Sequence, residues 1–303
     1  MNDEFFGLPK IHKSVEIQTA IKNQNSEYIT ILRPKDLKLR PIIAGPSCPK
    51  HWLSNFIDII LKPLSQYIPS YVRDDIDFLT HLPKHIDENA ILVTFDVTSQ
   101  YTNIPHDLGL NAIKYWIENH PGIIQNRFTL EFILDAVFIL ENNSFFFNSK
   151  YYLQIRGTAM GTKMAPTYAT LVMGFLKQQL YRKLEEIEGP EFTHHFENTW
   201  KRYLDDCFII WTKSSNALTN FERTLNNLHP AIKFTKEINS NNIPFLDILV
   251  IKNGTEINTD IFYKSTDTHQ YLDFRSCHTA HTKRNIPYCL ARKIFIYIYT
   301  FSF

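Results

Sequence analysis

The chain has 303 residues, of which 44% are hydrophobic, 14% aromatic and 21% charged. This composition excludes a largely disordered chain, because it provides enough apolar surface to form folded cores. The length exceeds what one hydrophobic core usually supports, so we expect about two or three subdomains. A formal net charge of +1 does not by itself indicate a nucleic-acid partner.

Basic side chains gather near both ends of the sequence, while most carboxylates lie in the middle. Between Gly7 and Arg40 there are seven lysines and arginines and three acids, and no acid follows Asp273. Five basic residues do follow it: Arg275, Lys283, Arg284, Arg292 and Lys293. This distribution fits a protein that holds phosphates at its ends and metal at its centre, and it fits two solvated basic faces equally well.

The four cysteines form no CxxC pair, which indicates a reducing compartment. No N-terminal signal pattern is present, and no apolar run reaches the ~18 residues of a membrane helix. We therefore expect an intracellular protein with no membrane partner.

The first predicted elements precede a buried strand. Residues 7–50 are basic and interrupted by prolines, and two apolar runs within them, Tyr28–Leu32 and Arg40–Ala44, predict the strands of a hairpin. Apolar residues at helical spacing predict a helix over 50–66. Ala90–Val97 is a continuous apolar run that ends beside a carboxylate, which is typical of a buried central strand.

Helices and a hairpin are predicted next. We expect helices at 107–119 and 129–141, from apolar residues at helical spacing. The segment 145–153 predicts a hairpin that turns at Asn148–Ser149. A long helix is expected from Pro166, a residue favoured in a first helical turn, to Glu188.

The last predicted elements surround a second acidic segment. Trp200–Trp211 predicts a strand, a tight turn and a second strand, and a helix over 215–228 and a strand over 232–238 follow. Pro244–Ile251 and Glu256–Tyr263 predict a hairpin around Asn253–Gly254. This order of elements is typical of an α+β fold with an antiparallel centre.

Three carboxylates are candidates for catalysis. Asp96 lies at the end of an apolar strand, and Asp205–Asp206 lie at the turn of an apolar hairpin. A two-metal phosphoryl-transfer site needs carboxylates from separate strands, because two ions ~4 Å apart share ligands. An acidic pair alone is weak evidence, since Asp74–Asp75 precedes a periodic run and is typical of a helix N-cap. Tyr203 before Asp205 and the apolar strand after Asp206 distinguish the second pair.

Three segments resemble the palm motifs of reverse transcriptases, in the correct order: Thr94–Tyr101, Gly157–Pro166 and Tyr203–Asp206. Further segments resemble the Penelope-like retroelement branch of that family: Gly7–Lys13, Tyr101–Pro105, Gly157–Pro166, Phe245–Asp247 and Cys277–Lys293. The resemblance extends over about residues 5–293.

The resemblance implies a right-hand polymerase fold, in which helices back a palm with a central antiparallel sheet. Partial fingers would occupy residues 1–89, with further fingers elements in 110–155. The palm, with motifs A to E, would occupy 90–264. A truncated helical thumb would start at 265–303, and no GIY-YIG nuclease is expected in this chain.

The resemblance also implies an activity and its partners. The chain would be an RNA-directed DNA polymerase that adds dNTPs to a primer 3′-hydroxyl, with an RNA template and a DNA primer or product. No obligate protein partner is inferred, and a nuclear location is expected. Asp96 and Asp205 would ligate two Mg²⁺ ions, or Mn²⁺ in their place, with Asp206 as a supporting ligand and the Val97 carbonyl completing the nucleotide site.

Further site residues follow from the resemblance. Tyr101 would be a steric gate that rejects the ribose 2′-hydroxyl, although a packing tyrosine is the alternative. Lys10 and Arg40 would neutralise the triphosphate, with Arg40 favoured for its bidentate guanidinium. Met160 and Gly161 would contact the nucleotide. Residues expected to contact nucleic acid are Lys163, Phe245, Leu246, Lys283, Arg284 and Arg292.

Several alternatives remain open. Lys233 or Lys236 is a candidate general acid toward pyrophosphate. Cys277, His278, His281 and Cys289 could form a zinc site, although their spacing matches no common one. Rival functions are an RNA-copying RNA polymerase, which Tyr101 disfavours, a telomerase-like protein, and a catalytically weakened retroelement remnant that only binds RNA or DNA.

Overall fold

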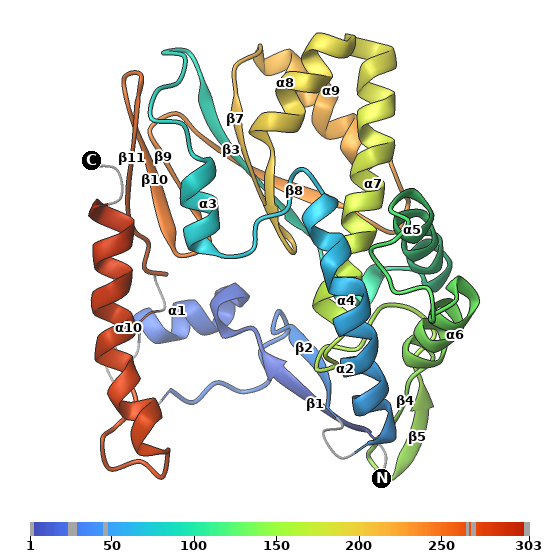
Figure 1. The fold of residues 1–303 in the computed structure, drawn as a ribbon. Helices are drawn as coiled ribbons and strands as arrows, with labels where there is room; N and C mark the ends of the chain where they lie inside the picture. The colour runs from blue at the N-terminus through green and yellow to red at the C-terminus, as the bar shows by residue number, and fades with distance from the viewer. Residues whose placement is uncertain (1–2, 24–28, 45–47, 265–266, 268–270, 300–303) are drawn as a thin grey trace. The chain divides into compact units, whose positions relative to one another are not determined.

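The protein is described by a computed structural model that covers residues 3–23, 29–44, 48–264, 267 and 271–299. The chain forms two compact units that interleave along the sequence (Figure 1). Unit 1 comprises Met1–Pro63 and Tyr101–Ala169, and unit 2 comprises Leu64–Gln100 and Thr170–Phe303. The subdomain boundaries expected at 89 and 264 stay a prediction.

Unit 1 contains a four-stranded sheet in the order β2-β1-β4-β5. Its strands are β1 (Asp3–Pro9), β2 (Leu39–Ala44), β4 (Ser144–Phe147) and β5 (Lys150–Leu153). The hairpin of β4 and β5 is confirmed, and its turn residues Asn148 and Ser149 both have positive φ, of 48° and 60°. Positive φ at both positions matches the right-handed twist of the flanking strands.

The hairpin predicted between Tyr28–Leu32 and Arg40–Ala44 is wrong. β2 pairs with β1 instead, while residues 29–32 form no strand and Tyr28 lies outside the described residues. The pairing of β1 with β2 extends over six residue pairs, from Glu4–Ala44 to Pro9–Leu39. Leu32, in contrast, is 90% exposed, so its run buries little apolar surface.

The helices of unit 1 are η1 (Ile11–Lys13), α1 (Val15–Asn23), α2 (Pro49–Leu61), α4 (Gln100–Asn103), α5 (His106–Asn119) and α6 (Leu130–Glu141). Three of them, α2, α5 and α6, agree with predicted spans, whereas η1, α1 and α4 were not predicted. The expected helix over 50–66 is α2 followed by the 3-10 helix η2 (Lys62–Tyr67), which continues into unit 2. α7 (Ala165–Glu188) begins in unit 1 and ends in unit 2.

Unit 2 is built on an antiparallel sheet in the order β6-β7-β3-β8. Its strands are β3 (Ile91–Val97), β6 (Lys201–Tyr203), β7 (Asp206–Trp211) and β8 (Phe234–Asn239). The predicted central strand and the predicted strand–turn–strand are confirmed. The helices of this unit are α3 (Asp75–His81), α8 (Pro190–Thr199), α9 (Ser215–Asn226) and α10 (Ala280–Tyr299).

A second sheet of unit 2 has the order β11-β10-β9. Its strands are β9 (Asn242–Phe245), β10 (Ile248–Asn253) and β11 (Glu256–Ile261). The predicted continuous strand Pro244–Ile251 is wrong, because the chain turns at Leu246–Asp247 with Leu246 at φ 56°. The hairpin of β10 and β11 is confirmed, and Gly254 and Thr255 form its turn.

Side-chain alternation gives the central sheet of unit 2 two different faces. On one face, the Phe95 ring lies 6.2 Å from Trp200 and 5.8 Å from Phe221 of α9. On the other, Phe208 packs against Phe78 of α3 at 5.1 Å and Phe245 of β9 at 5.7 Å. α3 and β9 therefore cover one face of β3 and β7, and α8 and α9 the other (Figure 1).

None of the described helices is long and apolar enough to cross a membrane.

Candidate active site

The hairpin of β6 and β7 ends in a tight turn. Tyr203 pairs with Asp206, which leaves Leu204 and Asp205 as the two turn residues. Leu204 has φ 48°, in the left-handed region that costs a residue with a Cβ about 1–2 kcal/mol. Strain of this kind clusters at functional sites, where the surrounding structure maintains it.

Asp96 and Asp206 lie directly opposite each other. β3 and β7 pair in a register that sets Asp96 against Asp206, and opposed residues of this kind have Cβ atoms about 4.5–5.5 Å apart. Asp205 is tied to the same strand end, because its carbonyl accepts a hydrogen bond from the Val97 amide at 3.1 Å. The three predicted carboxylates therefore come to one end of the central sheet.

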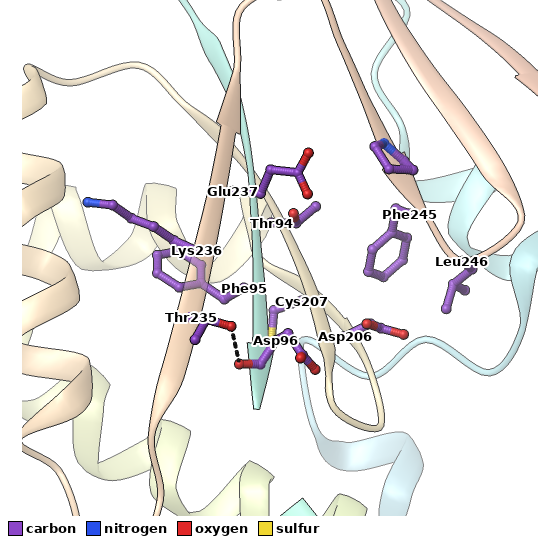
Figure 2. A pocket seen from close by; sticks show the side chains of 11 residues that line it. Thr94, Phe95, Asp96, Asp206, Cys207, Thr235, Lys236, Glu237, Phe245 and Leu246 are labelled. Carbon is purple, nitrogen blue, oxygen red and sulfur yellow. Dashed lines mark hydrogen bonds between the residues drawn. The ribbon is translucent and has the colours of Figure 1, made fainter. Parts of the chain in front are cut away.

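A cleft of about 360 Å³ opens beside Asp96 and Asp206. Phe245 and Leu246, predicted to contact nucleic acid, line it from β9 and the turn that follows (Figure 2). Thr235 of β8 completes the wall near Asp96, and its hydroxyl donates to the Asp96 carbonyl at 3.5 Å. The cleft thus has Asp96 and Asp206 at one side and an apolar pair at the other, and Glu237 of β8 adds a third carboxylate to its lining.

The two candidate general acids are engaged elsewhere. Lys236 points away from the two carboxylates in Figure 2 and pairs with Glu222 of α9 at 2.6 Å. Lys233 donates to the Asn226 carbonyl at 2.6 Å. In this arrangement neither ammonium group is directed at Asp96 or Asp206.

A second cleft of about 430 Å³ shares Asp206, Pro244 and Leu246 with the first. α10 is fastened to residues that line it. Lys293 pairs with Asp247, and the Tyr297 hydroxyl donates to Asp75, each at 2.5 Å. The predicted N-cap is confirmed for the neighbouring Asp74, whose carboxylate accepts the Asp77 amide at 2.8 Å.

The donor set at the sheet end suits Mg²⁺. This ion is usually held by one or two carboxylates together with substrate phosphates and waters, which matches Asp96 and Asp206 on adjacent strands. Within the described residues, no three side chains of His, Cys, Asp or Glu gather closely enough to hold a metal by themselves. The structure therefore does not assemble the zinc ligand set Cys277, His278, His281 and Cys289.

Of the two predicted triphosphate ligands, Arg40 lies on β2 of unit 1 and Lys10 directly follows β1. Arg40 of β2 pairs with Leu8 of β1, and Lys10 follows β1 with its amide bonded to the Lys38 carbonyl at 2.8 Å. The pairing of β1 with β2 thereby brings together the two ends of the segment between Lys10 and Arg40. β2 is also joined to the second palm segment, Gly157–Pro166, since the Ile43 amide donates to the Met160 carbonyl at 2.8 Å.

Tyr101 and the loop at Gly157 are in close contact within unit 1. The Thr158 amide donates to the Tyr101 carbonyl at 2.6 Å, and the Gly157 amide to the Ile104 carbonyl at 2.8 Å. Gly157 has φ 77°, and a Cβ there would lie 2.5 Å from the Tyr101 oxygen. Only glycine fits this approach of two backbone segments.

These paired carboxylates and the glycine loop agree with a comparison to known families. Residues 33–237 match the family described as "Reverse transcriptase (RNA-dependent DNA polymerase)". The chain belongs to the reverse transcriptase family. A search of curated proteins found no match.

Solved structures with the fold of this reverse transcriptase include telomerases and viral RNA polymerases. Telomerase from Candida albicans, in complex with a TWJ fragment of telomeric RNA, has a TM-score of 0.54 at 12% identity, over 85% of this chain and 48% of that chain. Apo telomerase from Candida tropicalis, truncated from its C-terminal domain, has a TM-score of 0.51 at 12% identity, over 82% and 60%. The BmCPV RNA-dependent RNA polymerase at elongation state has a TM-score of 0.52 at 13% identity, over 83% and 21%.

Identities this low establish the fold alone. The reverse transcriptase has the predicted α+β right-hand polymerase fold with an antiparallel sheet. It spans about half the length of the telomerases that it resembles.

Arg202 is a residue of the reverse transcriptase site that sequence reasoning missed. Its side chain is 1% exposed, and its guanidinium donates to the Leu204 carbonyl and the Thr170 carbonyl, each at 2.9 Å. Burial lowers the pKa of Arg202. It therefore braces the strained turn against α7. The sequence gives little signal for this burial, because Arg202 directly follows another basic residue, Lys201, in the short strand β6.

The remaining predicted nucleic-acid contacts of the reverse transcriptase lie mostly at the surface. Lys163 is exposed just before α7, and Arg284 and Arg292 are exposed on α10. Lys283 is half-buried and donates to the carbonyls of Phe274 and Ser276. Its ammonium group thus fixes the segment before α10.

Proposed function

We propose that this reverse transcriptase is an RNA-directed DNA polymerase of a Penelope-like retroelement. It would transfer a nucleotide from a dNTP to a primer 3′-hydroxyl on an RNA template. The observation that carries the proposal is the register that sets Asp96 opposite Asp206, with Asp205 in the adjoining turn. The Penelope-like assignment depends on the resemblance of Gly7–Lys13 and Tyr101–Pro105 to that branch.

The carboxylates would hold two Mg²⁺ ions, or Mn²⁺ in their place. When bound, the ions would activate the 3′-hydroxyl and stabilise the charge on the leaving pyrophosphate. Asp96 and Asp205 would ligate both ions, Asp206 on the adjacent strand would be a supporting ligand, and the Val97 carbonyl would complete the nucleotide site. Arg202 would keep the turn in place, because it holds the Leu204 carbonyl.

Unit 1 would select and hold the nucleotide. Arg40 would bind triphosphate oxygens in a bidentate manner, and Lys10 would add a point charge. Met160 and Gly161 would border the new base pair. Tyr101 would occupy the space that a ribose 2′-hydroxyl needs, so deoxynucleotides would be preferred.

Unit 2 would hold the primer and its duplex. Phe245 and Leu246 line the cleft that contains Asp206, which suits a grip on the primer end. Arg284 and Arg292 of α10, with Lys163 of unit 1, would contact phosphates. Contacts of this kind are independent of sequence and weaken steeply with salt.

The experiment is Mg²⁺-dependent extension of a DNA primer on an RNA template. The wild-type chain, Asp205→Asn and the control Asp260→Asn are compared, because Asp260 is an exposed carboxylate on β11 of the same unit. We expect dNTP addition by the wild type and the control, and its loss in Asp205→Asn with template–primer affinity retained.

Two results would contradict the proposal. Tight binding of template–primer without extension by the wild type would indicate a retroelement remnant that only binds nucleic acid. Extension with ribonucleotides in preference to dNTPs would indicate an RNA-copying RNA polymerase.

A further inference from the structure

A buried carboxyl group lies behind the nucleotide loop of unit 1. Glu141, the last residue of α6, is 2% exposed. Its Oε1 accepts a hydrogen bond from the Thr158 hydroxyl at 2.9 Å. Its Oε2 is buried and has no hydrogen-bond partner within the part of the chain that the structure describes. A buried carboxylate without a cation is costly, so the neutral acid is favoured.

The charged and titratable groups around Glu141 come from three other helices. From α7, Tyr168 has a buried hydroxyl without a partner among the described residues, and the charge of Glu141 raises the pKa of Tyr168 further than burial alone. From α5, Asp107 acts on Tyr168 in the same direction, and His106 contacts the Gly157 carbonyl at 3.1 Å. From α2, Lys50 binds the Asn142 carbonyl and the Asn143 side chain at 3.1 Å rather than the carboxyl group.

Thr158 connects this carboxyl group to Tyr101. Its hydroxyl bonds Glu141, while its amide donates to the Tyr101 carbonyl at 2.6 Å. Gly157, directly before it, packs on the backbone of Tyr101 and Thr102. Thr158 is itself 2% exposed, so water does not compete for either bond. The position of Tyr101 thus depends on a buried chain of contacts that ends at Glu141.

We propose that Glu141 is a positioning residue that fixes Tyr101 through Thr158 and so sets the discrimination between deoxy- and ribonucleotides, a role that rests on the proposed function. Glu141 does not touch the nucleotide. It holds the loop on which the position of the Tyr101 ring depends. The ring can exclude a 2′-hydroxyl only if it stays in a fixed position.

This arrangement makes discrimination depend on pH. Burial raises the pKa of Glu141 to about 8, and the Thr158 hydroxyl opposes the rise. Below that value the acid is neutral and compatible with its closed surroundings. Above it the buried carboxylate has no cation, so the loop must open to admit water. We therefore expect discrimination to fall as the pH rises through about 8.

The experiment measures single-turnover incorporation of a dNTP and the matching rNTP between pH 6.5 and 9. Four proteins are compared: wild type, Glu141→Gln, Thr158→Val and Thr158→Ser. Glu141→Gln keeps an acceptor oxygen but does not titrate, and Thr158→Val keeps the shape but loses the hydroxyl. Thr158→Ser, which keeps the hydroxyl, is the matched control.

We expect the wild-type ratio of dNTP to rNTP incorporation efficiency to fall roughly three- to tenfold above pH 8. A change of this size corresponds to the loss of about one hydrogen bond. Glu141→Gln should hold a high ratio at every pH, Thr158→Val a low one, and Thr158→Ser should follow the wild type. A wild-type ratio that ignores pH, or a Thr158→Val ratio equal to that of the wild type, would overturn the role of Glu141.

Hydrogen exchange at the Thr158 amide is a readout that needs no activity. At pH 9 it should be faster in the wild type than in Glu141→Gln at the same pH, and equal rates would overturn the inference. If the wild type incorporates no nucleotide at any pH, the proposed function fails, and the exchange rates still decide whether Glu141 holds the loop.

Discussion

Gly157→Ala is the substitution whose effect the structure determines most closely. The residue has φ 77°, where alanine costs about 1–2 kcal/mol. Its Cβ would lie 2.5 Å from the Tyr101 oxygen and 2.8 Å from the Thr102 Cα. Both are backbone atoms that cannot rotate away, and overpacking of this kind costs about 1–3 kcal/mol more. We therefore expect a loss of about 2–5 kcal/mol in the free energy of unfolding.

Gly122→Ala is the matched control within the same unit. Gly122 has φ 86°, but nothing lies within 4 Å of a Cβ built there, so only the backbone cost of about 1–2 kcal/mol remains. Urea unfolding of the two variants isolates the steric contribution, because the gain from a less flexible unfolded chain is common to both. Equal losses of stability in Gly157→Ala and Gly122→Ala would refute the close approach of the loop to Tyr101.

Three further predictions follow from the site. Tyr101→Ala should admit ribonucleotides in a primer-extension assay, and unchanged discrimination would remove the gate role. Arg202→Lys keeps the charge but loses the planar guanidinium that donates to the carbonyls of Leu204 and Thr170. We expect kcat to fall about tenfold to a hundredfold. An unchanged kcat would show that the turn does not depend on these two hydrogen bonds. Burial raises the pKa of Glu141 from 4.5 to about 8. Between these two pH values the folded chain therefore binds one more proton than the unfolded chain. The free energy of unfolding consequently falls as the pH rises through this window. Relative to Glu141→Gln, the wild type should lose up to about 5 kcal/mol of unfolding free energy over this window, and parallel pH profiles in urea melts would contradict it.

Elements with strong local periodicity could be predicted from the sequence. α5 and α6 bury one stripe of each helix, and β3 is mostly apolar, with Asp96 near its end. The turn at Asn148–Ser149 needs residues that tolerate positive φ, and asparagine is among the few that do. In these cases the local pattern and the tertiary structure favour the same conformation.

Features that depend on distant pairing could not be predicted. β2 pairs with β1, whose residues lie about 30 positions earlier in the chain, and not with the nearer run Tyr28–Leu32. The turn at Leu246 adopts a φ that leucine disfavours, so nothing local interrupts the expected strand. α8 was missed because its sequence is polar, with Phe192 and Phe196 as its main apolar residues.

The candidate site also contains residues that the sequence predicts and residues that it does not. Asp96 and Asp206 were recognised because each follows or begins an apolar strand, and the strand register then sets them opposite each other. Arg202 and Glu141 were missed because a charged side chain in a sequence is normally exposed. Their burial results from contacts with Thr170 and Thr158, which lie 32 and 17 residues away along the chain.

The central claim is that Asp96 and Asp206 act as one unit across β3 and β7. A double-mutant cycle of Asp96→Asn and Asp206→Asn, measured as the single-turnover rate of adding one dNTP to a DNA primer on an RNA template with Mg²⁺, tests it most directly. If both carboxylates serve the same metal ions, the double variant should be no slower than the slower single variant. Rate losses that multiply, or a rate in either single variant equal to that of the wild type, would contradict the account.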